Sequence, residues 1–321
     1  MDYSNVFVII FLIGTAFSFC LNQLLEFIDY KNRKITGTTI PPELSNVLTK
    51  ENLLQICRYE NAKYYFWIPE NIISTALALW LVCSGFYVCV LSMIHMHITQ
   101  NDFLTLLLFS IISSVPGAVL SLPFELFHEF VLEKKFGFST MTRKTWIADQ
   151  VKGIAVNLIL ISVLFAVMIA IFSIFKTSWW LFLGIAYICI SLLISIIYPL
   201  FIAPLFNKFT PLEQGTLRDK LEKLLAKCGF KANGLFVMDA SKRSKHSNAY
   251  FTGFGKSKRV VLYDTLLKQL TEEETEAVLA HELGHYKKHH IIKRLAVMIP
   301  VIILALFAAY TLSRVPEVFT A

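Results

Sequence analysis

The chain has 321 residues, of which 55% are hydrophobic and only 17% are charged, and this balance excludes an ordinary soluble protein. The net charge of +7 comes largely from the loops 31–70 and 123–153, and this bias places both loops and the segment 204–294 in the cytoplasm. We therefore interpret the charge as membrane topology, which excludes a nucleic-acid partner and makes the lipid bilayer the expected surroundings.

Six apolar runs approach the length of about 20 residues that crosses a bilayer. They are Val6–Leu25, Ile72–Ile94, Phe103–Leu122, Ile154–Phe175, Trp179–Ala203 and Leu295–Leu312. The first run is no cleavable signal peptide, because its apolar core is too long and Asp2 stands where a positive charge is expected. We predict a polytopic α-helical membrane protein with about six spans, an inserted α+β domain, and both termini outside.

We expect three domains along this chain. Residues 1–203 form membrane helices one to five with their cytoplasmic loops, residues 204–291 form the α+β insert, and residues 292–321 form the sixth helix and a short tail. In the insert, Leu212–Lys227 has apolar residues at helical spacing. Three runs rich in Val, Phe and Tyr predict strands, namely Leu235–Met238, Asn248–Thr252 and Arg259–Tyr263. The sequence Thr-Gly-Phe-Gly-Lys at 252–256 predicts a hairpin turn.

His281-Glu282-Leu283-Gly284-His285 is the stretch that predicts chemistry. On a helix, the two histidines lie one turn apart on one face and can reach the same zinc ion. The Glu282 carboxylate lies beside them, where it can take a proton from the attacking water as a general base. A capping box at 271–274 predicts the start of this helix, which we expect to run over Glu272–His290.

Asn248, Ala249 and Tyr250 are candidates for substrate binding, because proteases commonly hold a substrate backbone by adding it to an exposed sheet edge. The alternative is that this segment is simply a strand of the core.

Several stretches together resemble the type I CAAX prenyl proteases. They are Ser-Asn-Ala-Tyr-Phe-Thr-Gly-Phe-Gly-Lys at 247–256, Val-Val-Leu-Tyr-Asp-Thr-Leu-Leu at 260–267, Glu-Ala-Val-Leu-Ala-His-Glu-Leu-Gly-His at 276–285, and the shorter runs 204–212 and 133–138. The similarity covers most of the chain from about residue 120. It implies an integral-membrane zinc metalloendopeptidase of the gluzincin type, whose helices enclose a chamber that the active site faces. HtpX-like quality-control proteases share the zinc helix and the Asn-Ala strand, and they remain an alternative.

The resemblance is incomplete after the motif. Family members carry a third zinc ligand, a Glu in a Glu-x-x-x-Asp pattern on a later helix, whereas Glu317 is the only carboxylate here after His285. If Leu295–Leu312 spans the bilayer, Glu317 lies on the far side. Catalytic zinc sites ordinarily have three protein ligands. We therefore expect a chain that lacks the C-terminal part of the family, and the alternative is a catalytically impaired membrane scaffold.

The resulting hypothesis is a protease that removes C-terminal residues from prenylated CAAX proteins or peptides. His281 and His285 bind one Zn²⁺ per chain, Glu282 is catalytic, and the partner is a peptide or protein substrate, either prenylated or not. The expected location is the bacterial inner membrane or the endoplasmic reticulum membrane, with the insert on the cytoplasmic side.

Overall fold

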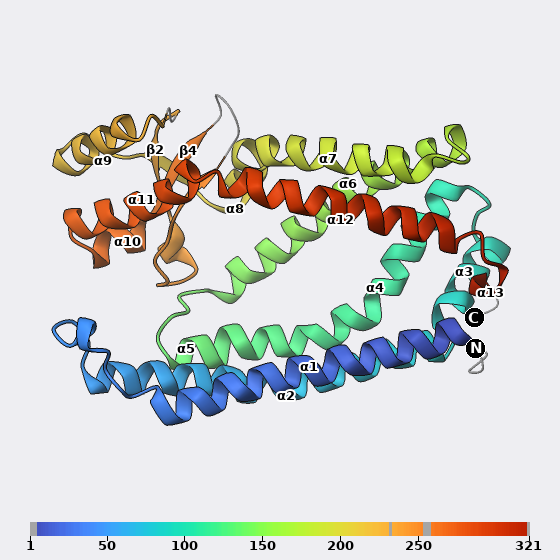
Figure 1. Cartoon of the computed structure of the whole chain (residues 1–321), viewed down its shortest axis with the longest axis horizontal. Coiled ribbons are helices and arrows are strands. Elements are labelled where there is room, and N and C mark those ends of the chain that lie inside the picture. Colours follow the sequence, from blue (N-terminus) through green and yellow to red (C-terminus); the bar gives the residue numbers. More distant parts are fainter. Residues whose placement is uncertain (1–4, 231–232, 253–257, 320–321) are drawn as a thin grey trace. The chain divides into compact units, whose positions relative to one another are not determined.

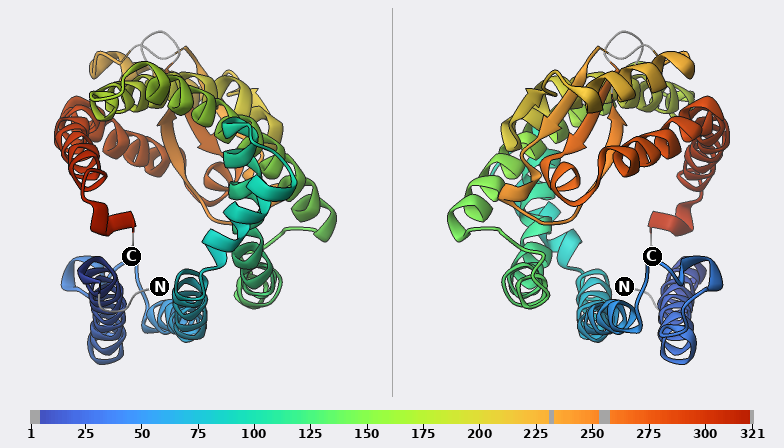
Figure 2. Two further views of the ribbon diagram at one scale, coloured as in Figure 1. Left: turned by 90° about the vertical axis from the view of Figure 1, so that its right-hand side faces the viewer. Right: turned by 90° about the vertical axis from the view of Figure 1, so that its left-hand side faces the viewer.

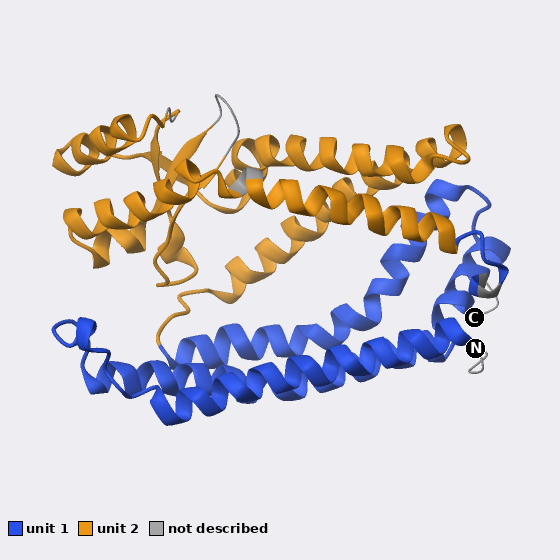
Figure 3. Cartoon of the chain, viewed as in Figure 1, with its two compact units in different colours: residues 1–136, 313–321 blue, residues 137–312 orange. Residues whose placement is uncertain are grey.

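The computed structural model describes residues 5–230, 233–252 and 258–319 of the chain (Figure 1). The chain divides into two compact units, one of Met1–Phe136 with Ser313–Ala321 and the other of Gly137–Leu312 (Figure 3). The boundaries 1–203, 204–291 and 292–321 stay a prediction.

The first unit is almost entirely helical. Its elements are α1 (Val6–Thr36), a 3₁₀ turn at Pro42–Leu44, α2 (Lys50–Cys83), α3 (Phe86–His97), α4 (Asp102–Phe127), a π-helical segment at His128–Leu132, α5 (Glu133–Lys135) and α13 (Pro316–Phe319). Helix α1 packs against α2, which also contacts α3 and α4. Helices α1, α2 and α4 begin at polar N-caps, whose side-chain oxygens accept hydrogen bonds from first-turn amides.

The second unit combines membrane-type helices with a small sheet. Its elements are α6 (Arg143–Ile174), α7 (Trp179–Ile197), a π-helical segment at Tyr198–Ile202, α8 (Ala203–Phe206), β1 (Phe209–Pro211), α9 (Thr216–Lys227), β2 (Leu235–Met238), a 3₁₀ turn at Ala240–Lys242, β3 (Ala249–Thr252), β4 (Arg259–Tyr263), α10 (Asp264–Gln269), α11 (Glu272–Lys287) and α12 (His290–Leu312). Helix α12 packs along α7, where Gly184 is buried against the Ile303 side chain.

Six of the described helical stretches are long and apolar enough to cross a membrane, which confirms the predicted class of polytopic helical protein with an α+β insert. One predicted span is wrong in its bounds. The run Ile72–Ile94 is two helices, because α2 ends at Cys83 and Gly85 takes a φ of +73° before α3 begins. Only glycine adopts that conformation readily, and a count of apolar residues does not detect it. Most spanning helices also extend past their apolar runs into charged sequence.

The sheet of the insert has the strand order β1-β2-β4-β3, and its arrows are visible in Figure 2. Strands β1 and β2 are antiparallel, β2 and β4 are parallel, and β4 and β3 are antiparallel. The predicted strands match β2, β3 and β4 to within one residue. The antiparallel pairing of β3 with β4 agrees with a hairpin, although its predicted turn at 252–256 lies mostly outside the described residues.

Alternation along the strands creates two apolar faces. Val260 and Leu262 of β4 join the larger cluster with residues of α9 and α11, whereas Val261 faces the opposite cluster with Met238. All three β4 side chains are at most 1% exposed. Since period-2 alternation sends neighbouring side chains to opposite faces, β4 is covered on both sides, and α11 packs on the larger face.

Candidate functional site

Helix α11 positions the predicted catalytic residues. Its N-cap Thr271 accepts a hydrogen bond from the Glu274 amide, and the Glu274 carboxylate accepts one from the Thr271 amide, which confirms the predicted capping box. The first turn is also tied to α9, because Lys220 Nζ lies 3.0 Å from Glu272 Oε2 and 2.6 Å from Glu273 Oε1. These contacts fix where the helix starts and therefore where its later residues lie.

The opposite faces of α11 have different roles. Thr275, Leu279 and Leu283 are buried at 1% exposure or less and pack toward the sheet. At 100° per residue, His281 and His285 fall on the face turned away from this buried stripe. Both histidines are exposed, and Glu282, on the flank between the two faces, is half-buried. The helix is thus anchored by one side and presents its imidazoles on the other.

The two imidazoles converge. His281 Nε2 and His285 Nε2 are 3.2 Å apart, with ring centroids separated by 4.9 Å. Two nitrogen ligands of a tetrahedral zinc ion, each about 2.0–2.1 Å from the metal, are separated by about 3.3 Å. The donor set and its spacing therefore fit a zinc ion.

A third histidine contacts this pair. His285 Nδ1 lies 2.8 Å from His290 Nδ1, with the two rings inclined at 68°. The pKa of His290 is lowered from its ordinary value, first by desolvation and then by the positive charges of His285, Lys293 and Lys288. The chain reaches this contact because α11 ends at Lys287 and α12 begins at His290, so the predicted continuous helix over Glu272–His290 is wrong in its last turn.

A third metal ligand is not found among the residues that the structure describes, where no group of three or more His, Cys, Asp and Glu side chains is placed to hold a metal ion. The side chain of Glu317, the one carboxylate after His285 in the sequence, lies outside the described residues.

Strand β3 lies at the edge of the sheet beside α11. The Tyr263 amide donates to the Asn248 carbonyl at 3.0 Å, so these two residues form a hydrogen-bonded pair. Hydrogen-bonded and non-bonded pairs alternate in an antiparallel ladder. Tyr250 therefore directs its backbone groups to β4, whereas Ala249 and Phe251 direct theirs to the free edge.

The side chains of the predicted substrate strand are differently placed. Asn248 is exposed, and its Oδ1 accepts a hydrogen bond from the Ala249 amide at 2.9 Å. The Tyr250 side chain points to the face opposite α11, near Met238, and burial raises its pKa to about 12. Tyr250 is thus a neutral packing side chain. Ala249 is only 2% exposed and its amide is occupied by Asn248 Oδ1, so the half-buried Phe251 supplies the more accessible backbone groups at the edge of β3.

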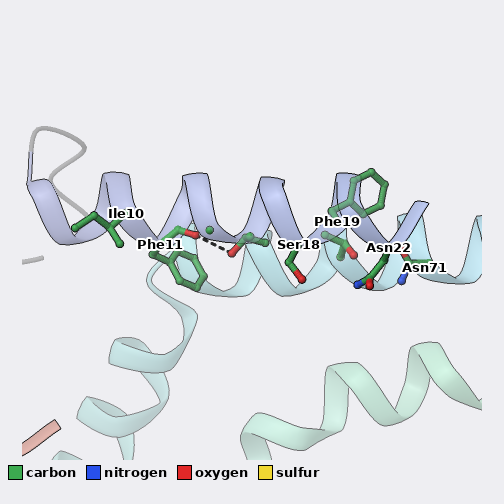
Figure 4. Close-up of a pocket in the computed structure, with 9 residues that line it drawn as sticks. Ile10, Phe11, Ser18, Phe19, Asn22 and Asn71 are labelled. Carbon is green, nitrogen blue, oxygen red and sulfur yellow. Dashed lines mark hydrogen bonds between the residues drawn. The ribbon is translucent and has the colours of Figure 1, made fainter. Parts of the chain in front are cut away.

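A separate cavity of about 430 Å³ lies between α1 and α2 in the first unit (Figure 4). Its lining mixes apolar groups with hydroxyls and amides: Ile10, Phe11, Gly14, Thr15, Ser18, Phe19, Asn22, Asn71 and Thr75. Gln23 Nε2 donates to Asn71 Oδ1 at 3.1 Å across the two helices. Polar groups in a membrane segment ordinarily face protein or water rather than lipid. None of the predicted site residues lines this cavity.

The fold and the helix α11 site define a class, a multi-pass membrane protein with a peptidase-type insert. Comparison with known proteins gives the family. A family model described as "CAAX prenyl protease N-terminal, five membrane helices" matches residues 29–208, and one described as "Peptidase family M48" matches residues 211–318. The chain belongs to the CAAX prenyl protease 1 family within the M48 peptidases.

Individual relatives support this assignment. CAAX prenyl protease 1 of Saccharomyces cerevisiae is 34% identical over 294 residues, which cover 88% of this chain and 64% of that protein. The homolog of Dictyostelium discoideum is 31% identical, with 97% of this chain and 73% of the relative covered. The crystal structure of S. mikatae Ste24p matches with a TM-score of 0.85 and 33% identity, over 92% of this chain and 71% of that one.

The chain is shorter than its relatives. It spans 64%, 51% and 66% of the lengths of the Saccharomyces cerevisiae, Oryza sativa and Arabidopsis thaliana proteins that it matches.

Proposed function

We propose that this chain contains the zinc helix of a membrane-embedded metalloendopeptidase of the CAAX prenyl protease 1 type. The observation that carries the proposal is the convergence of His281 Nε2 and His285 Nε2 at 3.2 Å on the exposed face of α11. Family membership supports the same chemistry, since residues 211–318 match the M48 peptidases.

In this proposal His281 and His285 hold a zinc ion, which supplies Lewis-acid polarisation of the scissile carbonyl when bound. Glu282 accepts the proton of the attacking water and then gives it to the leaving amine. The half-buried position of Glu282, on the flank of α11 next to the histidine face, supports this role.

The substrate backbone is held at the free edge of β3. Phe251 supplies the accessible outward backbone groups there, beside Ala249, whose amide is held by Asn248 Oδ1. Addition of an extended peptide to such an edge is a common mode of recognition. Asn248 and Tyr250 then shape the edge, Asn248 through its contact with the Ala249 amide and Tyr250 through packing on the opposite face.

The substrate class follows from the relatives, which are named CAAX prenyl protease 1. We propose that the substrate is a peptide or protein with a prenylated CAAX end, from which C-terminal residues are removed. Parallel assays of a farnesylated CAAX peptide and its bare counterpart test this choice. Faster cleavage of the bare peptide would favour an HtpX-like activity instead.

The proposed location is an endoplasmic reticulum or bacterial inner membrane, with the insert on the cytoplasmic side. The basic loops 31–70 and 123–153 support this orientation.

Zinc stoichiometry of the detergent-purified chain tests the metal site. About one zinc per chain is expected, and His285→Ala should lose it. An unchanged zinc content in His285→Ala would overturn the proposed site, and absence of zinc from the unmodified chain would support the alternative of an impaired scaffold.

A further inference from the structure

The contact between His285 and His290 extends the site beyond the His-Glu-x-x-His motif. The Nδ1 atoms of the two rings are 2.8 Å apart, which is hydrogen-bond distance. On the other side of the same ring, His285 Nε2 faces His281 Nε2 at 3.2 Å. His285 therefore uses one ring nitrogen toward the proposed metal position and the other toward His290.

A regular helix would not make this contact. Residues five apart on an α-helix differ by about 140° around the axis, so their side chains point in different directions. Here α11 stops at Lys287, and His289 takes a φ of +54°, the one positive φ of a non-glycine residue among those described. The break at His289 turns the chain so that the first residue of α12 returns to His285.

Metal binding through Nε2 of His285 defines the direction of the hydrogen bond between His285 and His290. The Nδ1 of His285 must then carry the proton and donate, and His290 Nδ1 must accept. Ring hydrogen bonds of this kind fix the tautomer and orientation of a metal-binding histidine and raise its basicity. In most such sites the acceptor is a carboxylate, a carbonyl or a water, whereas here it is an imidazole.

We propose that His290 is a positioning residue, an inference that rests on the proposed function. Its Nδ1 accepts a hydrogen bond from Nδ1–H of His285 and thereby holds the His285 ring in the orientation that binds zinc. His290 does not touch substrate in this proposal. Its effect is exerted on metal affinity, which is measurable without any assay of activity.

A matched pair of variants tests the proposal. Asn places its carbonyl oxygen the same number of bonds from the backbone as His Nδ1, whereas the Gln carbonyl lies one bond further. Zinc affinity of the detergent-solubilised 321-residue chain is measured by competition with a chelator. We expect His290→Gln and His290→Ala to weaken zinc binding about 10–100-fold, and His290→Asn to stay close to the unmodified chain.

His289→Asn is the control for the break between the helices. Asn tolerates positive φ, so this variant removes a neighbouring imidazole and keeps the turn, and it should bind zinc normally. Circular dichroism confirms that each variant is folded. If His290→Ala is not folded, the comparison of His290→Asn with His290→Gln decides alone.

Three results would overturn the inference: normal zinc affinity in His290→Gln, equal weakening in His290→Asn and His290→Gln, or equal weakening in His289→Asn. His285→Ala separates this failure from failure of the proposed function. If His285→Ala loses zinc and His290→Gln binds it normally, the proposed zinc site is supported and only the proposed role of His290 is refuted. Retention of zinc in His285→Ala overturns both.

Discussion

The insert and the membrane helices use apolar side chains in opposite ways. In the insert, Leu221, Val260, Leu262 and Leu279 are completely buried, at 0% exposure. In the spanning helices, at most 6% of the residues in any apolar window are buried. Leu304 of α12, for example, is 65% exposed. Apolar residues of the insert fill a core between sheet and helices, whereas most of those in the spans are exposed.

This difference determines how strictly the structure selects the side chain at each position. A core residue of the insert must match the shape of its neighbours, because protein interiors are close-packed. A lipid-facing residue has only to be apolar, so many residues serve equally well. The site on α11 therefore depends on the packing of the insert, and Gly184 of α7 is a place where a membrane helix has a similarly specific contact.

The largest expected difference between the regions is catalytic. Glu282→Gln removes the proposed general base from the insert, and we expect turnover of a CAAX peptide to fall by about 10²–10⁴-fold. Zinc content should be unchanged, because Glu282 is not a proposed ligand. The matched variant Glu125→Gln removes an exposed carboxylate from α4 and should keep normal turnover. Normal cleavage by zinc-loaded Glu282→Gln would contradict the assigned role.

Packing in the insert gives the next largest effect. Leu279→Ala creates a cavity between α11 and the sheet and should lower the free energy of unfolding of the insert by about 2–5 kcal/mol. Leu304→Ala, on an exposed face of α12, should change it by less than about 0.5 kcal/mol. Hydrogen exchange of the β4 amides reports both values. Equal effects of the two truncations would contradict the claim that apolar residues of the insert are more specifically packed than those of the spanning helices.

A smaller effect is expected where the two regions join. Arg243 makes a two-point ion pair with Asp149 of α6, at 2.7 and 2.9 Å, and donates to Asn207 Oδ1 at 2.9 Å. Lys keeps the charge of Arg but lacks its planar fork of donors. Arg243→Lys should therefore cost about 1.5 kcal/mol in free energy of unfolding of the insert, measured by the same exchange experiment.

The exposed neighbour Lys242 supplies the control for this junction. Lys242→Ala should leave exchange at β4 unchanged. If Arg243→Lys also left it unchanged, the Arg243–Asp149 pair would not contribute to the stability of the insert.

The sequence predicted most of what local chemistry determines. The capping box at Thr271, the placement of His281 and His285 on one helix face, and the strands β2, β3 and β4 all follow from residue type and spacing, which carry that information directly. The missed strand β1 has only three residues, too few for alternation to be recognised. Which backbone groups of β3 are open depends on its pairing with β4, which spacing alone does not reveal.

The proposed role of His290 could not be predicted from the spacing of residues along the sequence. Its contact with His285 requires a positive φ at His289, and a helical pattern assigns residues 272–290 to one continuous helix. The break at Gly85 was missed for a related reason, since apolar residues continue on both sides of it. In both places a single backbone angle overrides a regular pattern of side chains. The consecutive histidines at 289 and 290 were the sequence signal that a turn after the zinc motif could place one of them against His285.

The smallest expected effect tests whether helix N-caps contribute equally to stability in the two regions. Thr271 starts α11 and Thr49 starts α2, each in a capping box with the residue three positions later. Thr271→Ala and Thr49→Ala should each cost about 1 kcal/mol, because both caps satisfy free backbone amides at exposed helix ends. Exchange of first-turn amides in α11 and α2 measures the two costs.

Equal costs at Thr271 and Thr49 would mean that helix starts follow the same chemistry in both regions, and that the regions differ only in how their apolar faces are covered. A much larger cost at Thr271 would mean that the start of α11 is coupled to the core beneath it through Thr275 and Leu279, which are at most 1% exposed. In that case the His281–His285 pair would depend on the cap as well as on the core, and Thr271→Ala should weaken zinc binding too. Normal zinc affinity in Thr271→Ala would limit the effect of the cap to the first turn.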